Sequence, residues 1–271
     1  MPRILSDLHL FDAATRIQSL DALQPLLEGV DELVLNGDSL DTQHDMSPDQ
    51  LAAIKNTLGQ LAPRVILLSG NHDPDLTSQT ELMLCEGRVW VTHGDILFPD
   101  LTPWSAVRPT LANRIAAARR EVGDTAWADL ATRLRLYRAA CMDLPYEFDR
   151  SSRSFGQRVS RLMHTFFPPT RILAMANAWS TAPRRARALV TAHRPTAQVV
   201  INGHIHFPSV SRRAGQPTVV NTGSFTRPLG GYCADVSPTA VTVRRIREIN
   251  ARFHPGPLVA EIPLAPLPPA R

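Results

Sequence analysis

The chain has 271 residues, 44% hydrophobic and 20% charged, a composition that excludes disordered and fibrous proteins for most of its length. Its three cysteines are odd in number and form no C-x-x-C pair, which argues against a disulfide framework and a thiolate zinc site. The first residues lack an apolar signal core, and no stretch approaches the ~18 to 20 apolar residues of a membrane span. We therefore expect a cytoplasmic protein.

The net charge of +4 is unevenly distributed. The stretch 104–194 holds 16 arginines against six acidic residues, so the rest of the chain is acidic on balance. Such a basic region is typical of a surface that meets an anionic partner: phosphate groups, nucleic acid or an anionic membrane surface. A basic helical face exposed only to solvent explains the same charges equally well.

The first third of the chain alternates β-branched or leucine-rich runs with amphipathic stretches. Strands are predicted at RILS, ELVLN and RVILLS, with helices over 17–28 and 48–61 between them. Two more strands flank Glu86 and Gly87. A cluster of polar residues follows most of these strands. In open α/β sheets the ligand site forms outside the carboxyl ends of the strands, so the clusters are expected to meet there.

From 104 to 190 the strand signals disappear, and alanine, arginine and leucine recur at helical spacing. Prolines are predicted to divide this stretch into about four helices, at Pro145, at Pro168 with Pro169, and at Pro183. Strand signals return from QVVING to AVTVRRI. We predict an α/β core over 1–103 and 195–253, a basic helical insertion or cap over 104–194, and an extended proline-rich tail over 254–271.

Five short clusters carry the chemistry. In chain order they are Asp7-x-His9, Gly37-Asp38-x-x-Asp41, Gly70-Asn71-His72-Asp73, His93-Gly94-Asp95 and Gly203-His204-x-His206. Imidazoles with carboxylates, one of which can bridge, are the ligands that two divalent cations ~3.5 to 4 Å apart require. Residues two apart line the same face of a strand, and Asp7 and His9 are expected where the strand turns into its loop. The clusters predict a dinuclear metal site.

These clusters resemble, motif for motif and in order, the signature of calcineurin-like metallophosphoesterases. The resemblance implies a four-layer αββα sandwich with a helical insertion, and two divalent ions drawn from Mn, Fe, Zn or Co. It implies that a hydroxide bridging the ions attacks a phosphoester or pyrophosphate in line. The implied ligands of the first ion are Asp7, His9, His206 and the bridging Asp38, and those of the second are Asp38, Asn71, His93 and His204.

The resemblance also implies a catalytic role for His72, as general acid or hydrogen-bond donor to the leaving group. Asp41 is its expected partner, because a carboxylate on one ring nitrogen keeps an imidazole oriented and protonated. Asp73 and Asp95 are expected either to orient a ligand or to cap a turn. The Asn221-Thr222-Gly223-Ser224 segment is expected to shape its loop.

The substrate stays open. The position of the insertion resembles that in bacterial UDP-2,3-diacylglucosamine hydrolases, which implies a lipid-linked pyrophosphatase at the inner membrane surface. Those enzymes carry G-N-R-D where this chain has Gly70 to Asp73, and Glu where it has Asp41. An open apolar groove lined by Ile115, Leu134 and Leu162 would favour a lipid. The alternatives are a soluble nucleotide or small phosphoester, a nuclease using the basic insertion, and a catalytically silent metal-binding scaffold.

Overall fold

The computed structural model describes residues 1–41, 46–98, 107–142, 144 and 170–267. The strands are β1 Pro2–Leu5, β2 Glu32–Asn36, β3 Arg64–Leu68, β4 Glu81–Leu84, β5 Val89–Thr92, β6 Val199–Asn202, β7 Ser209–Ser211, β8 Thr218–Asn221, β9 Tyr232–Val236, β10 Ala240–Ile249 and β11 Arg252–Pro263. The helices are η1 Leu20–Leu23, α1 Gln24–Leu27, α2 Pro48–Gly59, η2 Asp95–Leu97, α3 Arg108–Ala128, α4 Leu130–Cys141 and α6 Thr170–His193. No helix among these is both long and apolar enough to cross a membrane.

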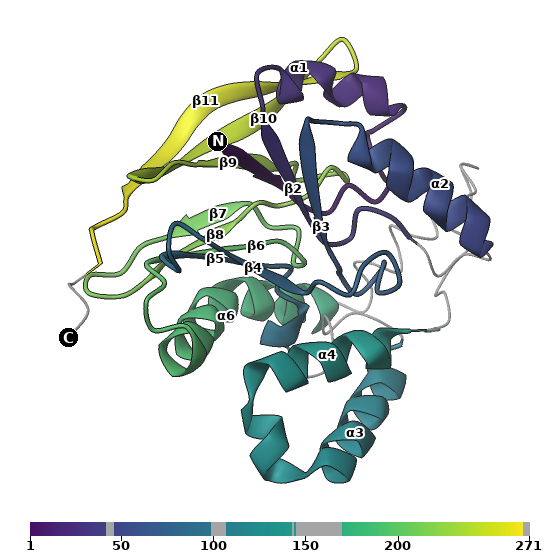
Figure 1. The fold of residues 1–271 in the computed structure, drawn as a ribbon, viewed down its shortest axis with the longest axis vertical. Helices are drawn as coiled ribbons and strands as arrows, with labels where there is room; N and C mark the ends of the chain where they lie inside the picture. The colour runs from purple at the N-terminus through teal and green to yellow at the C-terminus, as the bar shows by residue number, and fades with distance from the viewer. Residues whose placement is uncertain (42–45, 99–106, 143, 145–169, 268–271) are drawn as a thin grey trace.

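The strands form two sheets that lie face to face (Figure 1). The first has the order β11-β10-β9-β1-β2-β3, and the second has the order β4-β5-β6-β8-β7. Within the first sheet β1, β2 and β3 are parallel, and within the second β5, β6 and β8 are parallel. Parallel strands end at the same edge of their sheet, so the loops that follow β1, β2, β3, β5 and β6 can meet in one place.

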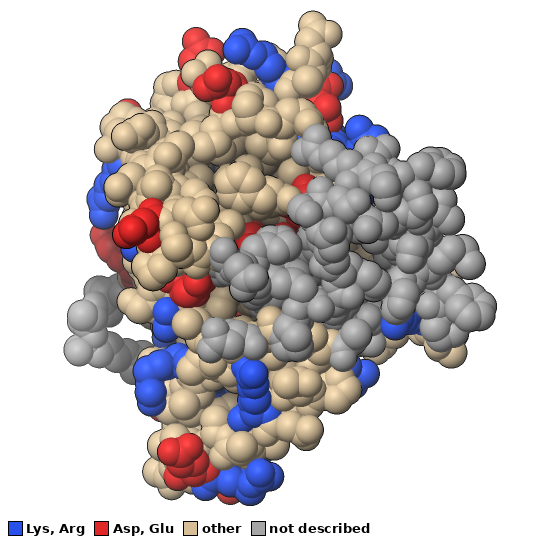
Figure 2. All heavy atoms as spheres, turned by 90° about the vertical axis from the view of Figure 1, so that its right-hand side faces the viewer, with Lys and Arg blue, Asp and Glu red and all other residues tan. Residues whose placement is uncertain are grey.

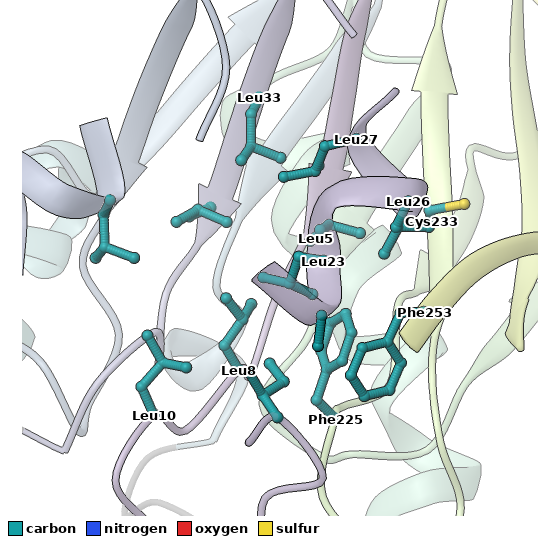
Figure 3. Close-up of a cluster of buried hydrophobic side chains, with 14 of the residues drawn as sticks. Leu5, Leu8, Leu10, Leu23, Leu26, Leu27, Leu33, Phe225, Cys233 and Phe253 are labelled. Carbon is teal, nitrogen blue, oxygen red and sulfur yellow. The ribbon is translucent and has the colours of Figure 1, made fainter. Parts of the chain in front are cut away.

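Side chains that alternate between the two faces of each strand form the packed layers. In β2, Leu33 and Leu35 pack with residues of η1, α1 and α2, whereas Val34 packs with Val91 of β5 between the two sheets. Successive side chains of a strand point to opposite faces, so a continuous apolar run is buried on both. Figure 3 shows part of the outer cluster, in which Leu5, Leu23 and Leu26 pack together and the rings of Phe225 and Phe253 meet edge-to-face.

The outer face of the second sheet is covered by helices of the stretch 104–194. Trp90 and Val200 pack with residues of α3 and α4, and Val219 packs with residues of α6. Figure 1 shows α6 beneath this sheet and α3 with α4 beyond it. The predicted four-layer αββα architecture is confirmed. The helices of the predicted insertion supply its fourth layer, and the boundaries proposed between core and insertion stay a prediction.

Many arginines of the insertion tie it to the core. Their guanidinium groups donate to backbone carbonyls or to a carboxylate: Arg138 to Thr77, Arg185 to Leu97, Arg187 to Pro217 and Arg194 to Glu81. Others, such as Arg119 and Arg184, are exposed. On the face in Figure 2, basic side chains lie over the lower part, where Figure 1 places these helices, with acidic ones at its lower end. Part of the basic charge is therefore structural.

Two sequence predictions about proline were wrong. Pro183 does not divide its helix, because α6 runs through it and packs Ala178, Ala182 and Ala186 against the core. The tail predicted from His254 is strand β11 as far as Pro263, paired with β10. Proline is tolerated there because β11 is an edge strand and the pairing is irregular between Val243 and Ile246. The other prolines expected to divide the insertion lie outside the described residues.

The helix predicted over 17–28 is shorter than expected. It consists of the 3-10 turn η1 and the single turn α1, ending at Leu27. Gly29 follows in a left-handed conformation with φ of 71°, which turns the chain toward β2. The helix predicted over 48–61 is confirmed as α2, with a capping box between Ser47 and Gln50.

Candidate metal centre

Every predicted site residue lies in a loop at the carboxyl end of a parallel strand. Asp7 and His9 follow β1, Asp38 and Asp41 follow β2, and Asn71 and His72 follow β3, all from the first sheet. His93 follows β5, and His204 and His206 follow β6, from the second. The site is therefore built where the facing edges of the two sheets meet.

Five of these residues have a left-handed backbone. Their φ angles are 54° for Asp7, 47° for His9, 50° for Asp38, 68° for His204 and 53° for His206. Non-glycine residues rarely adopt this conformation, which costs of order 1–3 kcal/mol each and persists where the surroundings impose it. Because these residues lie beyond the ends of β1, β2 and β6, the turns rather than strand geometry set the directions of their side chains. The expected position of Asp7 and His9, where the strand turns into its loop, is confirmed.

Asp7, His9 and His206 form the first donor group. His206 Nε2 lies 3.1 Å from Asp7 Oδ1 and 3.1 Å from His9 Nε2, and His9 Nε2 lies 4.0 Å from Asp7 Oδ1. One potential ligand atom from each residue falls within 4.8 Å of the others. Asp7 also accepts hydrogen bonds from Ser6 Oγ and from the backbone N–H of His204. Asp7 thereby joins the loops of both sheets.

Asp38, His93 and His204 form the second donor group, also within 4.8 Å. His93 Nε2 lies 3.1 Å from Asp38 Oδ2, and His93 Nδ1 donates to the carbonyl of Asn36 at 3.0 Å. A hydrogen bond at one ring nitrogen fixes which nitrogen faces a metal. Asp38 Oδ2 is also 3.9 Å from His9 Nε2, so this carboxylate faces both groups.

The third group joins His9 and His72 through Asp41. Asp41 Oδ1 lies 2.6 Å from His72 Nδ1, and Asp41 Oδ2 lies 3.6 Å from His9 Nδ1. The His9 and His72 rings are perpendicular, with centroids 5.0 Å apart. Asp41 is fully buried, whereas the His72 side chain is 20% exposed. The predicted pairing of His72 with Asp41 is present.

Asn71 is buried in the loop after β3, which is tied together and to the β2 loop by hydrogen bonds. The backbone N–H of Gly70 donates to Asp73 Oδ1, and that of His72 donates to Asp38 Oδ1. Asp73 also accepts from the N–H groups of Asp38 and Ser39, so it caps both loops rather than orienting an imidazole. Burial and the charge of Asp38 raise the pKa of Asp73 to about 7, against its backbone hydrogen bonds.

Two glycines are required by close packing at the site. A Cβ at Gly70 would meet the carboxylate and the backbone nitrogen of Asp38, and a Cβ at Gly203 would meet Asp7 Oδ2 and Ser6 Oγ. Each clash would displace a proposed metal ligand, Asp38 in the first case and Asp7 in the second. Both positions therefore require glycine.

Several residues outside the five predicted clusters support the ligands. Ser6 Oγ lies 2.6 Å from Thr222 Oγ1, and Thr226 Oγ1 lies 3.3 Å from His206 Nδ1. Asn221 Nδ2 donates to Asn202 and to the carbonyl of Gly203, so the expectation that its segment shapes the loop is confirmed. Ser6 and Thr226 are adjacent to noted motifs, but nothing in their spacing marks the contact.

The buried charges of the cluster compensate one another. Burial alone would lower the pKa of His9, but Asp41, Asp38 and Asp7 outweigh it and raise this pKa to about 9. Burial also opposes the charge of His93, yet Asp38 and Asp7 raise its pKa well above the usual value. In the metal-free protein these histidines are cations that offset three buried carboxylates.

His204 differs from the other ligand candidates. Burial, and then the charge of His93, lower its pKa to about 3, so its imidazole is neutral at physiological pH. Its buried Nε2 has no hydrogen-bond partner among the described residues. A buried, neutral ring nitrogen next to carboxylates is a good ligand and a costly group to leave without a partner. The donor set thus fits divalent cations that accept mixed nitrogen and oxygen ligands.

Residues 3–208 match the family model for calcineurin-like phosphoesterases. The chain belongs to this family. The match covers all five clusters and confirms the resemblance seen in their order. No curated protein resembles this family member closely enough to count as a match.

Several solved structures have a similar fold. A predicted phosphoesterase from Streptococcus pneumoniae is 14% identical, with a TM-score of 0.42 over 97% of this chain and 96% of its own. A dimetal phosphatase from Danio rerio is 11% identical, with a TM-score of 0.45 over 97% and 98%. Vacuolar protein sorting 29 from Cryptosporidium parvum is 12% identical, with a TM-score of 0.42 over 97% of each chain. Likenesses at this level say nothing about activity.

Proposed function

We propose that this family member is a phosphoesterase that binds two divalent cations and hydrolyses a phosphoester or pyrophosphate. The observation that carries the proposal is the position of Asp38, whose Oδ2 faces His93 Nε2 at 3.1 Å and His9 Nε2 at 3.9 Å. A carboxylate between two donor groups is what a pair of ions requires as a bridge. Asp7, His9, His206 and Asp38 would hold one ion, and Asp38, Asn71, His93 and His204 the other.

When bound, the two ions would polarise the phosphoryl group and lower the pKa of water, so that a nucleophile exists at neutral pH. The chain supplies the rigid frame for that chemistry. Asp73 caps the loops of Asp38 and His72, and Asp7 joins the loops of both sheets. These buried hydrogen bonds keep the ligands in place before substrate arrives, which limits the reorganisation that the reaction requires.

His72 would protonate the leaving oxygen, or donate a hydrogen bond to it. Asp41 Oδ1 accepts from His72 Nδ1 at 2.6 Å, which fixes the ring and directs Nε2 away from the carboxylate. The partial exposure of His72, against the burial of Asp41, suits a group that meets substrate. Asp41 also faces His9, so one carboxylate would orient both a ligand and the proton donor.

The packing of the insertion favours a soluble phosphorylated substrate over a lipid-linked one. Ile115 and Leu134 are buried in a cluster with Trp90 and Tyr137, so neither lines an open apolar groove. Leu162 lies outside the described residues. An anionic small molecule could be met by exposed arginines of the insertion, since guanidinium groups bind phosphate in bidentate fashion. Binding of an anionic membrane surface by the same arginines is the alternative.

The test compares hydrolysis of bis(p-nitrophenyl) phosphate, p-nitrophenyl phosphate and a UDP-linked diacyl sugar by the Mn²⁺-loaded protein. Asp38→Asn keeps the size of the side chain but replaces one carboxylate oxygen with an NH₂ group, which cannot bind a cation. Activity should therefore fall by at least about 100-fold. His254→Ala, on strand β11, serves as a matched histidine control and should keep full activity. Absence of turnover by folded, metal-loaded protein would favour the binding scaffold.

His72→Ala separates the roles further. If His72 assists the leaving group, its loss should cost little with p-nitrophenol, which leaves readily, and about 10²–10⁴-fold with an alkyl phosphoester, whose leaving oxygen needs a proton. An equal loss with both esters would contradict this role.

A further inference from the structure

Helix α6 contacts the loop that carries two of the ligand candidates. Trp179 Nε1 donates a hydrogen bond of 3.1 Å to the carbonyl of Ile205, the residue between His204 and His206. The indole also stacks on Phe207, with ring centroids 4.7 Å apart and an interplanar angle of 18°. Ile205 itself is buried in a cluster with residues of α6. The helix thus contacts both the backbone and the side chains of this loop.

This loop needs to be held. His204 and His206 both have a left-handed backbone, with φ of 68° and 53°, and such residues keep that conformation only where neighbouring groups impose it. Inside the loop, Ile205 N donates to Gly203 O at 2.8 Å, and His204 N donates to Asp7. The bond from Trp179 adds a restraint on the same segment, at the carbonyl of Ile205.

A second tie links α6 to the loop after β5. Arg185 Nη1 donates to the carbonyl of Leu97 at 3.2 Å, and its guanidinium carbon lies 5.0 Å from the ring centroid of Phe98. The Phe98 ring in turn lies 5.8 Å from the His204 ring. Leu97 ends η2, which begins two residues after His93. One helix therefore touches the loops of both histidines of the second donor group.

We infer that α6 is a brace for the metal ligands and that Trp179 is a positioning residue, which acts on both proposed metal sites through Ile205. His206 belongs to the first donor group and His204 to the second, so displacement of Ile205 moves a ligand of each. The inference rests on the proposed function, because it takes these histidines as ligands. It assigns to the insertion a role in metal affinity in addition to covering the sheet.

The experiment titrates the metal-free, full-length protein with Co²⁺ and follows the visible absorption of the bound ion. Trp179→Phe keeps an aromatic ring beside Phe207 but removes the N–H donor. Groups that orient ligands typically contribute 10–100-fold to metal affinity, and we expect about a tenfold loss at both sites with an altered Co²⁺ spectrum. Trp127→Phe is the matched control: Trp127 lies in the same insertion, packs with Arg133 and should leave affinity and spectrum unchanged.

Each outcome decides a different point. Wild-type affinity and spectrum in Trp179→Phe would overturn the positioning role while leaving the proposed function intact. Equal losses in Trp179→Phe and Trp127→Phe would also overturn it, because general loosening of the insertion would then be the cause. Failure of the wild-type protein to bind Co²⁺ would contradict the proposed function itself.

Discussion

Single residues at the metal centre hold more than one loop at a time. Asp7 accepts from Ser6 in its own loop and from the backbone of His204 in the loop after β6 of the other sheet. The sequence motifs identified the ligand side chains because carboxylates and imidazoles that follow predicted strands indicate a metal site. The contacts of Ser6 with Thr222 join residues 216 positions apart, and no local pattern predicts them. The position of Asp7 and His9 in a loop was predicted from the sequence, whereas their left-handed backbone was not.

Gly203→Ala should weaken metal binding. The added Cβ would meet Asp7 Oδ2 and Ser6 Oγ, so the Asp7 carboxylate must move out of the first donor group. We expect at least a tenfold loss of metal affinity, measured by calorimetric titration. Gly59→Ala is the control, since nothing lies within 4 Å of its added Cβ. Unchanged affinity in Gly203→Ala would show that Asp7 is not a ligand.

Asp73→Asn should destabilise the fold. The carboxylate accepts four backbone N–H groups, from Asp38, Ser39, Leu40 and Gly70. An amide offers a single acceptor oxygen and turns an N–H₂ group toward these donors, so the free energy of unfolding should fall by about 2–3 kcal/mol. Urea denaturation measures this loss. Asp124→Asn, at an exposed ion pair, should change stability by less than about 0.5 kcal/mol.

Elements with local signals were predictable, and elements fixed by tertiary contacts were not. Helix α2 has a capping box in its sequence and forms where expected. Pro183 and the prolines of β11 are local breakers, yet α6 continues because its alanines pack on the core, and β11 forms because it pairs with β10. Only the rest of the fold shows that a proline falls on an edge strand.

Phe253→Ala should show that β11 belongs to the core. The side chain is fully buried, and its ring meets that of Phe225 edge-to-face at 5.1 Å. Removal of a buried phenyl ring typically costs about 3–5 kcal/mol, which chemical denaturation would detect. Leu258→Ala on the same strand is the control, because Leu258 is 52% exposed and should cost less than about 0.5 kcal/mol. Similar small losses in both variants would mean that β11 is a loose tail.

Over the whole molecule, metal and protons compete for one buried cluster. His9, with a pKa of about 9, and His93, with a pKa raised well above its usual value, are protonated at pH 7 without metal. A histidine whose pKa is higher in the folded than in the unfolded state stabilises the folded state fully below about pH 6.5. That contribution is lost as pH rises toward 9. The metal-free protein should therefore have a Tm that falls over this window, which differential scanning calorimetry measures.

Metal binding at pH 7 should release about two protons, because imidazole ligands must be neutral. Calorimetric titrations in two buffers of different ionisation enthalpy should give observed enthalpies that differ accordingly. The affinity should also rise with pH up to about pH 9. Identical enthalpies in both buffers would contradict the protonation of His9 and His93.

The number of ions bound per chain tests the dinuclear site most directly. Metal-free protein would be titrated with Mn²⁺ and followed by electron paramagnetic resonance, with Asp38→Asn in parallel. We predict two ions per wild-type chain with the signal of a magnetically coupled pair, and loss of that coupling in Asp38→Asn. A single isolated ion, or two uncoupled ions insensitive to Asp38, would contradict the bridged site.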